Sequence, residues 1–217
     1  MAKRRKVGNL LALALLAQLA PGLPMHPYQL ANVLRRTGKD TEMKIKWGSL
    51  YTVVQNLEKH GFIQAVGSDR EGRRPERTSY AITEAGRDEM CDWIRELISE
   101  PEPELSRFEA ALSVVAVVGP DETQSLLQRR LAALESGIEA ERAVLAEAGK
   151  TVARLFLIEA EYLLAMHEAE AAWVRSLLTE LAEGTLPGLA QWREYHQTRE
   201  IPPEWVQLVA KGGAAEN

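Results

Sequence analysis

The 217-residue sequence predicts a mainly α-helical protein with one small β-hairpin. Three observations support this fold class. Apolar residues recur at helical spacing over most of the chain, and two short runs rich in β-branched and aromatic residues lie close together in the first half. The segment Pro101-Glu102-Pro103-Glu104 marks a shift to a composition rich in Ala, Leu, Glu and Arg. We therefore expect two folded parts joined at this proline-rich segment.

The first two predicted helices cover residues 8–20 and 27–37. The first is almost entirely apolar and stops at Pro21-Gly22, so we expect it to be buried. The second begins at Pro27, a residue suited to a first helical turn, and Gly38 is placed to end it. The segment 39–47 that follows is polar and serves as a linker.

A third helix is expected from Ser49 to about Lys59, where Gly61 ends it. The spacing of its apolar residues places one face of the helix on the core: Leu50, Val53, Val54 and Leu57. The other face is polar and carries Tyr51, Thr52, Gln55, Asn56 and Lys59. This helix is therefore amphipathic and short, the size that fits a DNA major groove, which is about 12 Å wide.

Two strands, 62–67 and 77–82, should pair through a turn that contains several arginines. A fourth helix then runs from a cap at Thr83 to about Ser99, with Met90, Trp93, Ile94 and Leu97 packing inward. A polar-faced helix beside a hairpin with a basic tip is the layout of a winged helix-turn-helix. The pattern indicates that the protein binds double-stranded DNA.

Charge is divided in the way that this interpretation requires. Residues 1–80 contain 14 Lys and Arg against 6 Asp and Glu, a balance of +8. Residues 81–217 contain 12 against 25, a balance of −13, which gives the net charge of −5. A basic first part joined to an acidic second part is typical of a DNA-binding head on a body that does not bind DNA. The alternative is that these charges are solvated surface, which we accept for the acidic part.

We assign DNA-binding roles by side-chain chemistry. Polar groups near the start of the third helix suit base edges, and lysines and arginines suit phosphates and narrow minor grooves. For each of them the alternative is an ordinary solvated side chain, and for the wing it is a charge cluster that protects an edge strand. The candidates are Lys44, Lys46, Ser49, Tyr51, Thr52, Gln55, Asn56, Lys59, Arg73, Arg74 and Arg77.

The second part predicts an apolar helix over 105–118 and two long helices over about 121–148 and 151–183. The first long helix has one apolar side, made of Leu127, Leu131, Leu134, Ile138 and Leu145. The second has apolar residues spaced by three or four, a seam for another helix. We expect an antiparallel long-helix dimerisation domain with these contacts: Leu155, Ile158, Tyr162, Met166, Trp173 and Leu177. The alternative is a hairpin within one chain, buried against 105–118.

The predicted domains are a winged helix-turn-helix over 1–100, a dimerisation domain over 101–185, and a partly ordered tail over 186–217 that docks through its aromatic residues. A small aromatic effector could lie between the first two domains, although aromatic residues are more often plain core. The effector candidates are Trp93, Tyr162, Met166 and Trp173.

Other classes of function find little support. The four histidines have no ligand-like spacing, and no nucleophile motif, phosphate loop or dinucleotide fingerprint is present, so we expect no metal, no cofactor and no enzyme activity. Lys3-Arg4-Arg5-Lys6 before an apolar run resembles a secretory signal, but we favour a core helix and a cytoplasmic protein. The run is too short to span a membrane, which takes about 20 apolar residues. The single Cys91 excludes an internal disulfide.

Five blocks over roughly residues 8–99 are similar, in order and spacing, to the PadR family of transcriptional regulators. They are His26-Pro27-Tyr28-Gln29-Leu30, Gly48-Ser49-Leu50-Tyr51, Leu57-Glu58-Lys59-His60-Gly61-Phe62-Ile63, Gly72-Arg73-Arg74-Pro75-Glu76-Arg77 and Tyr80-Ala81-Ile82-Thr83-Glu84-Ala85-Gly86.

The long second part resembles the subfamily with a multi-helix dimerisation domain. The resemblance implies a homodimeric repressor, often released by a small molecule, in which Ser49, Tyr51 and the wing arginines carry the DNA motifs. Trp47 and Thr52 stand where many members have proline, and Pro27 replaces a frequent glycine, so the base contacts could differ. The competing hypothesis is a protein-interaction module that works through its acidic C-terminal helices.

Overall fold

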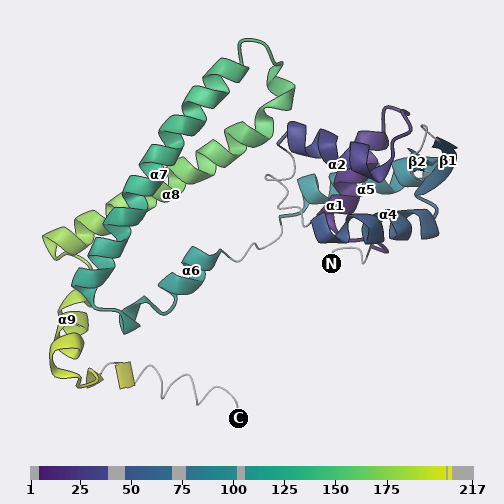
Figure 1. Cartoon of the computed structure of the whole chain (residues 1–217). Helices are drawn as coiled ribbons and strands as arrows, with labels where there is room; N and C mark the ends of the chain where they lie inside the picture. Colours follow the sequence, from purple (N-terminus) through teal and green to yellow (C-terminus); the bar gives the residue numbers. More distant parts are fainter. Residues whose placement is uncertain (1–4, 39–46, 70–76, 102–105, 204, 207–217) are drawn as a thin grey trace. The chain divides into compact units, whose positions relative to one another are not determined.

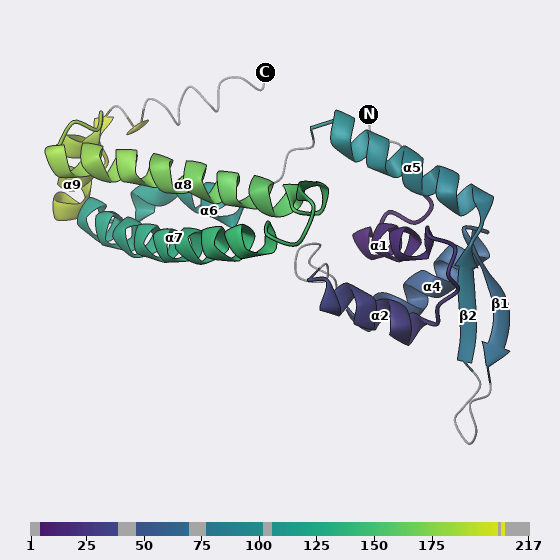
Figure 2. The same ribbon diagram turned by 90° about the horizontal axis from the view of Figure 1, so that it is seen from above.

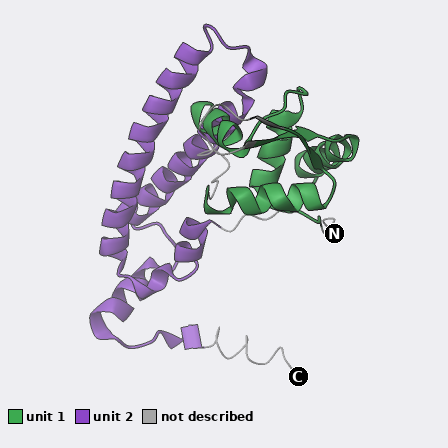
Figure 3. Cartoon of the chain, turned by 45° about the vertical axis from the view of Figure 1, so that its right-hand side comes forward, with its two compact units in different colours: residues 1–104 green, residues 105–217 purple. Residues whose placement is uncertain are grey.

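The computed structural model describes residues 5–38, 47–69, 77–101, 106–203 and 205–206. Four of the predicted DNA-binding residues lie outside these ranges: Lys44, Lys46, Arg73 and Arg74. The chain divides into two compact units, residues 1–104 and residues 105–217 (Figure 3). Most of the described chain is helical, with one two-stranded antiparallel sheet, so the predicted fold class is confirmed.

Unit 1 consists of four α-helices, one 3₁₀ turn and the β-hairpin within its described residues (Figures 1 and 2). In chain order these elements are α1 (Leu10–Leu19), α2 (Pro27–Arg36), η1 (Trp47–Ser49), α4 (Leu50–Lys59), β1 (Ile63–Asp69), β2 (Arg77–Ile82) and α5 (Glu84–Ser99).

Helix α1 forms the centre of the unit 1 core. Seven of its ten residues are buried, and it contacts α2, α4, β2 and α5. Leu11, Leu15, Leu16 and Leu19 are at most 1% exposed. Burying a leucine side chain contributes about 1.5–3 kcal/mol, so this helix is a major source of the unit's stability. The apolar run after the basic cluster is thus a core helix, as the sequence predicts.

Three of the four described α-helices of unit 1 begin at a residue whose side chain caps the helix, namely α1, α2 and α5. The Asn9 side chain accepts a hydrogen bond from the backbone N–H of Leu11. His26 and Gln29 form a reciprocal capping box at the start of α2. Ser49 makes no such bond to α4. Ser49 instead ends the 3₁₀ turn η1, which leads directly into α4.

The two strands pair with Ile63 opposite Ile82 and Asp69 opposite Arg77, and a bulge lies between Ala65 and Gly67. A single bridge extends the sheet, because the backbones of Met25 and Tyr80 exchange two hydrogen bonds of 3.0 and 2.9 Å. This bridge ties the segment before α2 to the wing.

The predicted packing of α5 holds for two of its four residues, Met90 and Trp93. Trp93 is buried and Met90 is partly buried, but Ile94 is 37% and Leu97 is 42% exposed, so the expectation that these two pack is wrong for this chain. The reason is length. Helix α5 has 16 residues against the 10 of α1, so α1 cannot cover the whole inner face of the longer helix (Figure 2).

Arg5 fastens the start of the described chain to α5. Its guanidinium forms ion pairs with Glu89, at 2.8 Å, and with Glu96. The same guanidinium lies 5.3 Å from the ring centroid of Trp93. One cation of the basic N-terminal cluster is therefore used inside unit 1.

The described residues of unit 2 form helices joined by turns and irregular segments, without a strand. Its elements are α6 (Arg107–Leu112), η2 (Val115–Val117), α7 (Pro120–Ala148), η3 (Arg154–Phe156), α8 (Ile158–Glu183) and α9 (Leu189–Thr198). Helices α7 and α8 lie side by side as an antiparallel hairpin (Figures 1 and 2). Within the described residues, no helix is long and apolar enough to cross a membrane.

Two predicted helices of unit 2 are shorter than expected. The expected helix 105–118 is split into α6 and η2, because the valine-rich stretch 114–118 is a poor helix former. The expected helix 151–183 starts only at Ile158, after the turn η3. The apolar side predicted for the first long helix faces α8, with Leu127 and Ile138 buried. Trp192 of α9 is buried in the same core and donates hydrogen bonds from its indole to backbone carbonyls at 116 and 118.

The junction between the hairpin and α5 leaves no room for a side chain at Gly86. A Cβ atom at this position would lie 2.0 Å from the backbone oxygen of Phe62. The junction is further held by Thr83, whose hydroxyl donates to the Gly61 carbonyl at 2.6 Å and accepts from the Gly86 N–H at 3.0 Å. The helix therefore approaches the chain after α4 as closely as glycine alone permits.

We predict that Gly86→Ala destabilises unit 1 by about 3 kcal/mol or more, because backbone atoms must move to relieve the overlap. Urea unfolding followed by circular dichroism measures the change. Gly8→Ala is the matched control, since a Cβ there would meet nothing within 4 Å. Equal stability of the two variants would contradict the close approach.

Candidate nucleic-acid interface

Helix α4 separates its apolar and polar residues as the sequence predicts. Leu50, Val53, Val54 and Leu57 are buried in the unit 1 core. The other face is exposed to solvent, and Tyr51 at its start is 67% exposed. The remaining exposed members of this face are Thr52, Gln55, Asn56 and Lys59. The structure thus brings five of the predicted DNA-binding residues together on one free helix surface.

Helices α2 and α4 both pack on α1 and contact each other, in the order of a helix-turn-helix. In such a pair the second helix enters the major groove and the first crosses the DNA backbone. The N-terminal end of α4 carries the partial positive charge of the helix dipole, which favours a nearby phosphate. The arrangement supplies both polar side chains for base edges and a backbone that suits phosphate.

The hairpin forms the wing beside α4. Its strands contact each other over their described length, and β1 follows α4 after a single turn at Gly61, where φ is +74°. Arg77, the only predicted wing arginine in the described part of the chain, begins β2 with its backbone paired to Asp69. The base of the wing therefore lies against α4.

A hydrogen bond between Tyr80 and Glu58 also joins the wing to α4. The Tyr80 hydroxyl on β2 bonds to the Glu58 carboxylate on α4. Burial and the negative charge of Glu58 raise the pKa of the Tyr80 phenol above its usual value. The sequence pattern did not reveal this contact, because the two residues are 22 positions apart and belong to different elements.

A second contact that the sequence did not reveal lies at the turn between α2 and α4. The guanidinium of Arg35, near the end of α2, lies over the indole ring of Trp47, 4.4 Å from the ring centroid. Trp47 begins η1 and packs partly buried against the unit 1 core.

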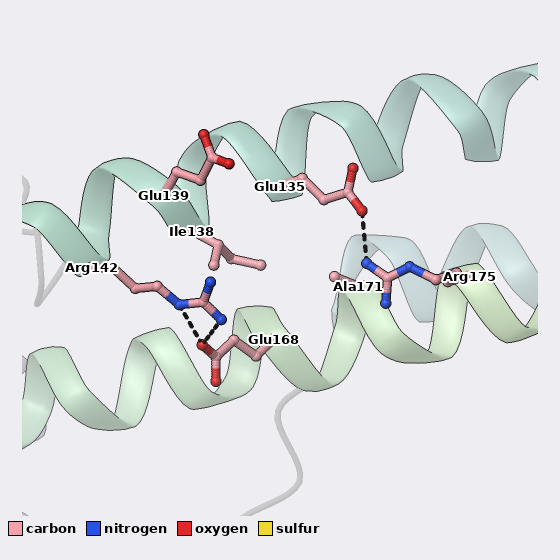
Figure 4. Close-up of a pocket in the computed structure, with 7 residues that line it drawn as sticks. All are labelled: Glu135, Ile138, Glu139, Arg142, Glu168, Ala171 and Arg175. Atoms are coloured by element: carbon pink, nitrogen blue, oxygen red, sulfur yellow. Dashed lines mark hydrogen bonds and ion pairs between the residues drawn. The ribbon is translucent and has the colours of Figure 1, made fainter.

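The residues predicted to bind an effector are divided between the two units. Trp93 is 5% exposed in the core of unit 1, whereas Tyr162, Met166 and Trp173 are exposed on α8 of unit 2. The Trp173 ring makes an edge contact with Phe108 at 6.0 Å. A hollow of about 420 Å³ on the α7–α8 hairpin contains none of these residues (Figure 4). Its rim carries the ion pairs Arg142–Glu168 and Arg175–Glu135.

Most of the predicted dimerisation residues are exposed on a strip that begins at η3 and continues along α8. Leu155, Ile158, Tyr162, Met166 and Trp173 are all at least 46% exposed, and Leu177 is partly buried against the unit 2 core. The apolar residues Phe156 and Leu163 extend this strip and were not among the predicted contacts. We call the seven exposed residues of this set the α8 strip.

Three helices in helix-turn-helix order, a closing fourth helix and a two-stranded wing define a winged helix-turn-helix protein of the DNA-binding class. The model of the transcriptional regulator PadR-like family matches residues 15–92. This segment therefore belongs to the PadR-like family of transcriptional regulators.

Solved structures show the same fold over both units. A structure of Bacillus subtilis PadR in complex with operator DNA has a TM-score of 0.63 and 17% identity, and the match covers 79% of this chain and 99% of that one. The structure of the same protein in complex with p-coumaric acid has a TM-score of 0.65 and 16% identity, and the match covers 80% of this chain and 99% of that one. The structure of the Vibrio cholerae virulence activator AphA has a TM-score of 0.54 and 17% identity, and the match covers 80% of this chain and 98% of that one. A search of curated proteins gave no match.

We predict that Tyr80→Phe changes stability mainly at alkaline pH. A folded-state pKa raised above the unfolded value gives a contribution that is complete below about pH 10 and is lost as pH rises through the folded pKa. The variant should therefore lose less stability than the wild type as the pH rises above about 10. Urea unfolding across this range measures the difference, with Tyr28→Phe as the control on an exposed tyrosine. Identical alkaline profiles for wild type and Tyr80→Phe would contradict the assignment.

Proposed function

We propose that the protein is a homodimeric transcriptional repressor that binds operator DNA through α4 and the wing and is released by a small aromatic effector. The observation that carries the proposal is the exposed polar face of α4, which begins at Tyr51 and stands beside the hairpin. Similar structures support it, since Bacillus subtilis PadR was solved both with operator DNA and with p-coumaric acid.

DNA recognition is assigned as follows. Tyr51 and Thr52 in the first turn of α4 contact base edges or the adjoining backbone, and Gln55 and Asn56 in the next turn pair with adenine. Lys59 and the basic residues of the linker and wing bind phosphates, which supply affinity without sequence information. These basic residues are Lys44, Lys46, Arg73, Arg74 and Arg77, and Ser49 lies at the phosphate nearest the helix start.

Dimerisation is assigned to the α8 strip. Large apolar side chains that are this exposed and grouped along η3 and α8 mark a surface that another protein covers. Helix α7 already covers the opposite side of α8 through Ile138 and Leu127, so the strip is left for a second copy of the chain. A symmetric dimer presents two α4 helices and predicts a two-fold operator with half-sites about 34–36 Å apart, or a multiple of this.

The effector is assigned to the same surface as the dimer contacts, at Tyr162, Met166 and Trp173 of α8, rather than to Trp93, which is buried in the core of unit 1. Planar rings stack on tyrosine and tryptophan, and methionine adapts to irregular ligands. Release of operator DNA by a planar aromatic acid in a gel-shift assay tests this part of the proposal. A reporter gene behind the chain's own upstream region tests repression, because loss of the protein should raise expression.

We predict that Tyr51→Ala weakens binding to the operator about tenfold or more and leaves binding to random duplex within about twofold. The reason is that one specific contact contributes about 1–3 kcal/mol, and 1.4 kcal/mol corresponds to tenfold. Fluorescence anisotropy at fixed salt measures both affinities. The variant Tyr51→Phe separates the contribution of the hydroxyl group to binding from that of the ring. Equal losses on operator and random duplex would remove the role assigned to Tyr51.

We predict that the double variant Tyr162→Glu, Met166→Glu raises the dimer dissociation constant by about 100-fold or more, since two charges per subunit would be buried without partners. Sedimentation velocity over a range of concentrations measures the shift to monomer. Ala140→Glu, an exposed position on α7 outside the α8 strip, is the matched control. Unchanged sedimentation of the double variant would exclude this surface.

A further inference from the structure

We infer that Arg35 is an additional DNA contact: the Trp47 indole holds its guanidinium so that it binds a backbone phosphate next to the recognition helix. This inference rests on the proposed function, because it names a positioning and contact pair within the same DNA-binding surface. Neither residue is among the DNA-binding candidates that the sequence suggested.

The indole is a fixed platform. Trp47 packs partly buried against the unit 1 core at the first position of η1, and α4 begins three residues later. Tyr51, the first exposed aromatic residue of the recognition helix, follows four positions after Trp47, about one helical turn. A group held on this ring therefore lies at the N-terminal end of α4, where the first interactions with DNA are expected.

Arg35 contacts the Trp47 ring from α2, the helix that precedes η1 in the chain. It lies in the last turn of α2, and its guanidinium is 4.4 Å from the Trp47 ring centroid. Stacking on an aromatic face uses the flat surface of the guanidinium and leaves its five N–H donors free at the edge. The stacked arginine has also lost part of its side-chain freedom before it meets a ligand, which reduces the entropic cost of binding.

Two other arginines provide an internal comparison, because each also lies over an aromatic ring. Arg5 lies over Trp93 and is paired with Glu89 and Glu96. Arg130 lies 3.7 Å from the ring centroid of Phe108 and is paired with Glu170. These two stacked guanidiniums are thus neutralised by carboxylates of the same unit.

Arg35 differs from both. Its side chain is exposed, and it forms no hydrogen bond or ion pair with any residue in the described part of the chain. A stacked guanidinium with free donors suits an anion that comes from outside the protein. The DNA phosphate is the anion that a helix-turn-helix brings to this turn, because the first helix crosses the DNA backbone.

The competing explanation is a brace, in which the stack only stabilises the α2–α4 turn. The two explanations differ in their dependence on salt. A protein cation that binds a phosphate releases condensed counterions, so removing that cation lowers the slope of log K against log salt by about 0.9 for each phosphate that is no longer bound. A brace changes thermal stability and leaves this slope unchanged.

The experiment measures the affinity of the full-length protein for its own upstream region and for random duplex by anisotropy between about 50 and 200 mM salt. We expect Arg35→Ala to lower the salt slope by about 0.9 per bound subunit. It should also reduce the affinity of the protein for both duplexes by a similar factor, since phosphate binding carries no sequence information. Arg36→Ala is the matched control: the neighbouring arginine is also exposed on α2 but has no aromatic platform among the described residues, and its slope should stay near the wild-type value.

Variants of Trp47 test the platform. Trp47→Leu keeps the charge of Arg35 and removes the ring. It should reduce the affinity for both duplexes about three- to tenfold, which corresponds to a loss of about 0.7–1.4 kcal/mol from the cation–π contact and the ordering of the arginine. Trp47→Phe keeps an aromatic face and should stay within about threefold of the wild type. Thermal melting of each variant, measured in parallel, separates weaker DNA binding from incomplete folding.

Three outcomes would overturn the inference. An unchanged slope for Arg35→Ala, with or without a lower melting temperature, leaves the stack as a brace at most. Equal slope changes for Arg35→Ala and Arg36→Ala would mean that charge alone matters and the platform does not. If the wild type binds neither duplex, the proposed function fails and the inference fails with it. If the wild type binds and only the Arg35 prediction fails, the proposed function is unaffected.

Discussion

The structure of unit 1 depends on the burial of α1. A helix that is apolar on every side can exist in water only if other elements surround it, and α1 contacts α2, α4, β2 and α5. Each of these elements uses its apolar face against α1 and leaves its polar face outside. The polar face of α4 is therefore exposed because its other face is committed to the core, as the burial of Leu57 and Val54 shows. The presentation of Tyr51 follows from the same constraint.

Electrostatics separates the roles of the two units. In unit 2 the carboxylates of α7 and α8 pair with arginines across the hairpin, among them Arg142 with Glu168 and Arg175 with Glu135 (Figure 4). These exposed pairs contribute little stability individually, but they favour the observed register of the two helices. In unit 1 Lys59 on α4 and Arg35 at the adjoining turn remain exposed without a carboxylate partner among the described residues. Unit 2 contains 10 Lys and Arg against 17 Asp and Glu, a balance of −7, whereas residues 1–80 of unit 1 have a balance of +8. A polyanion is therefore attracted to the first 80 residues and repelled by unit 2.

The local patterns that the sequence carries were reliable where one element decides the outcome. The spacing of Leu50, Val53, Val54 and Leu57 correctly predicted which side of α4 is buried. The cap at Thr83 was also predictable, because capping depends on residues a few positions apart. Prediction failed where neighbours decide. Ile94 and Leu97 have the spacing of a core face, but the described part of unit 1 does not bury them. The start of α8 was placed too early because helical spacing continues through the turn η3.

The sequence by itself determined the order of helices and strands, the polar face of the recognition helix and the division of charge between the two parts, because each follows from residue type at short range. Only the tertiary structure decided the contacts between elements: Tyr80 with Glu58, Arg35 with Trp47, and the approach of Gly86 to Phe62. Such contacts depend on the angles at which helices and strands pack, and these angles arise from the whole core. Periodicity and spacing in the sequence do not specify these packing angles.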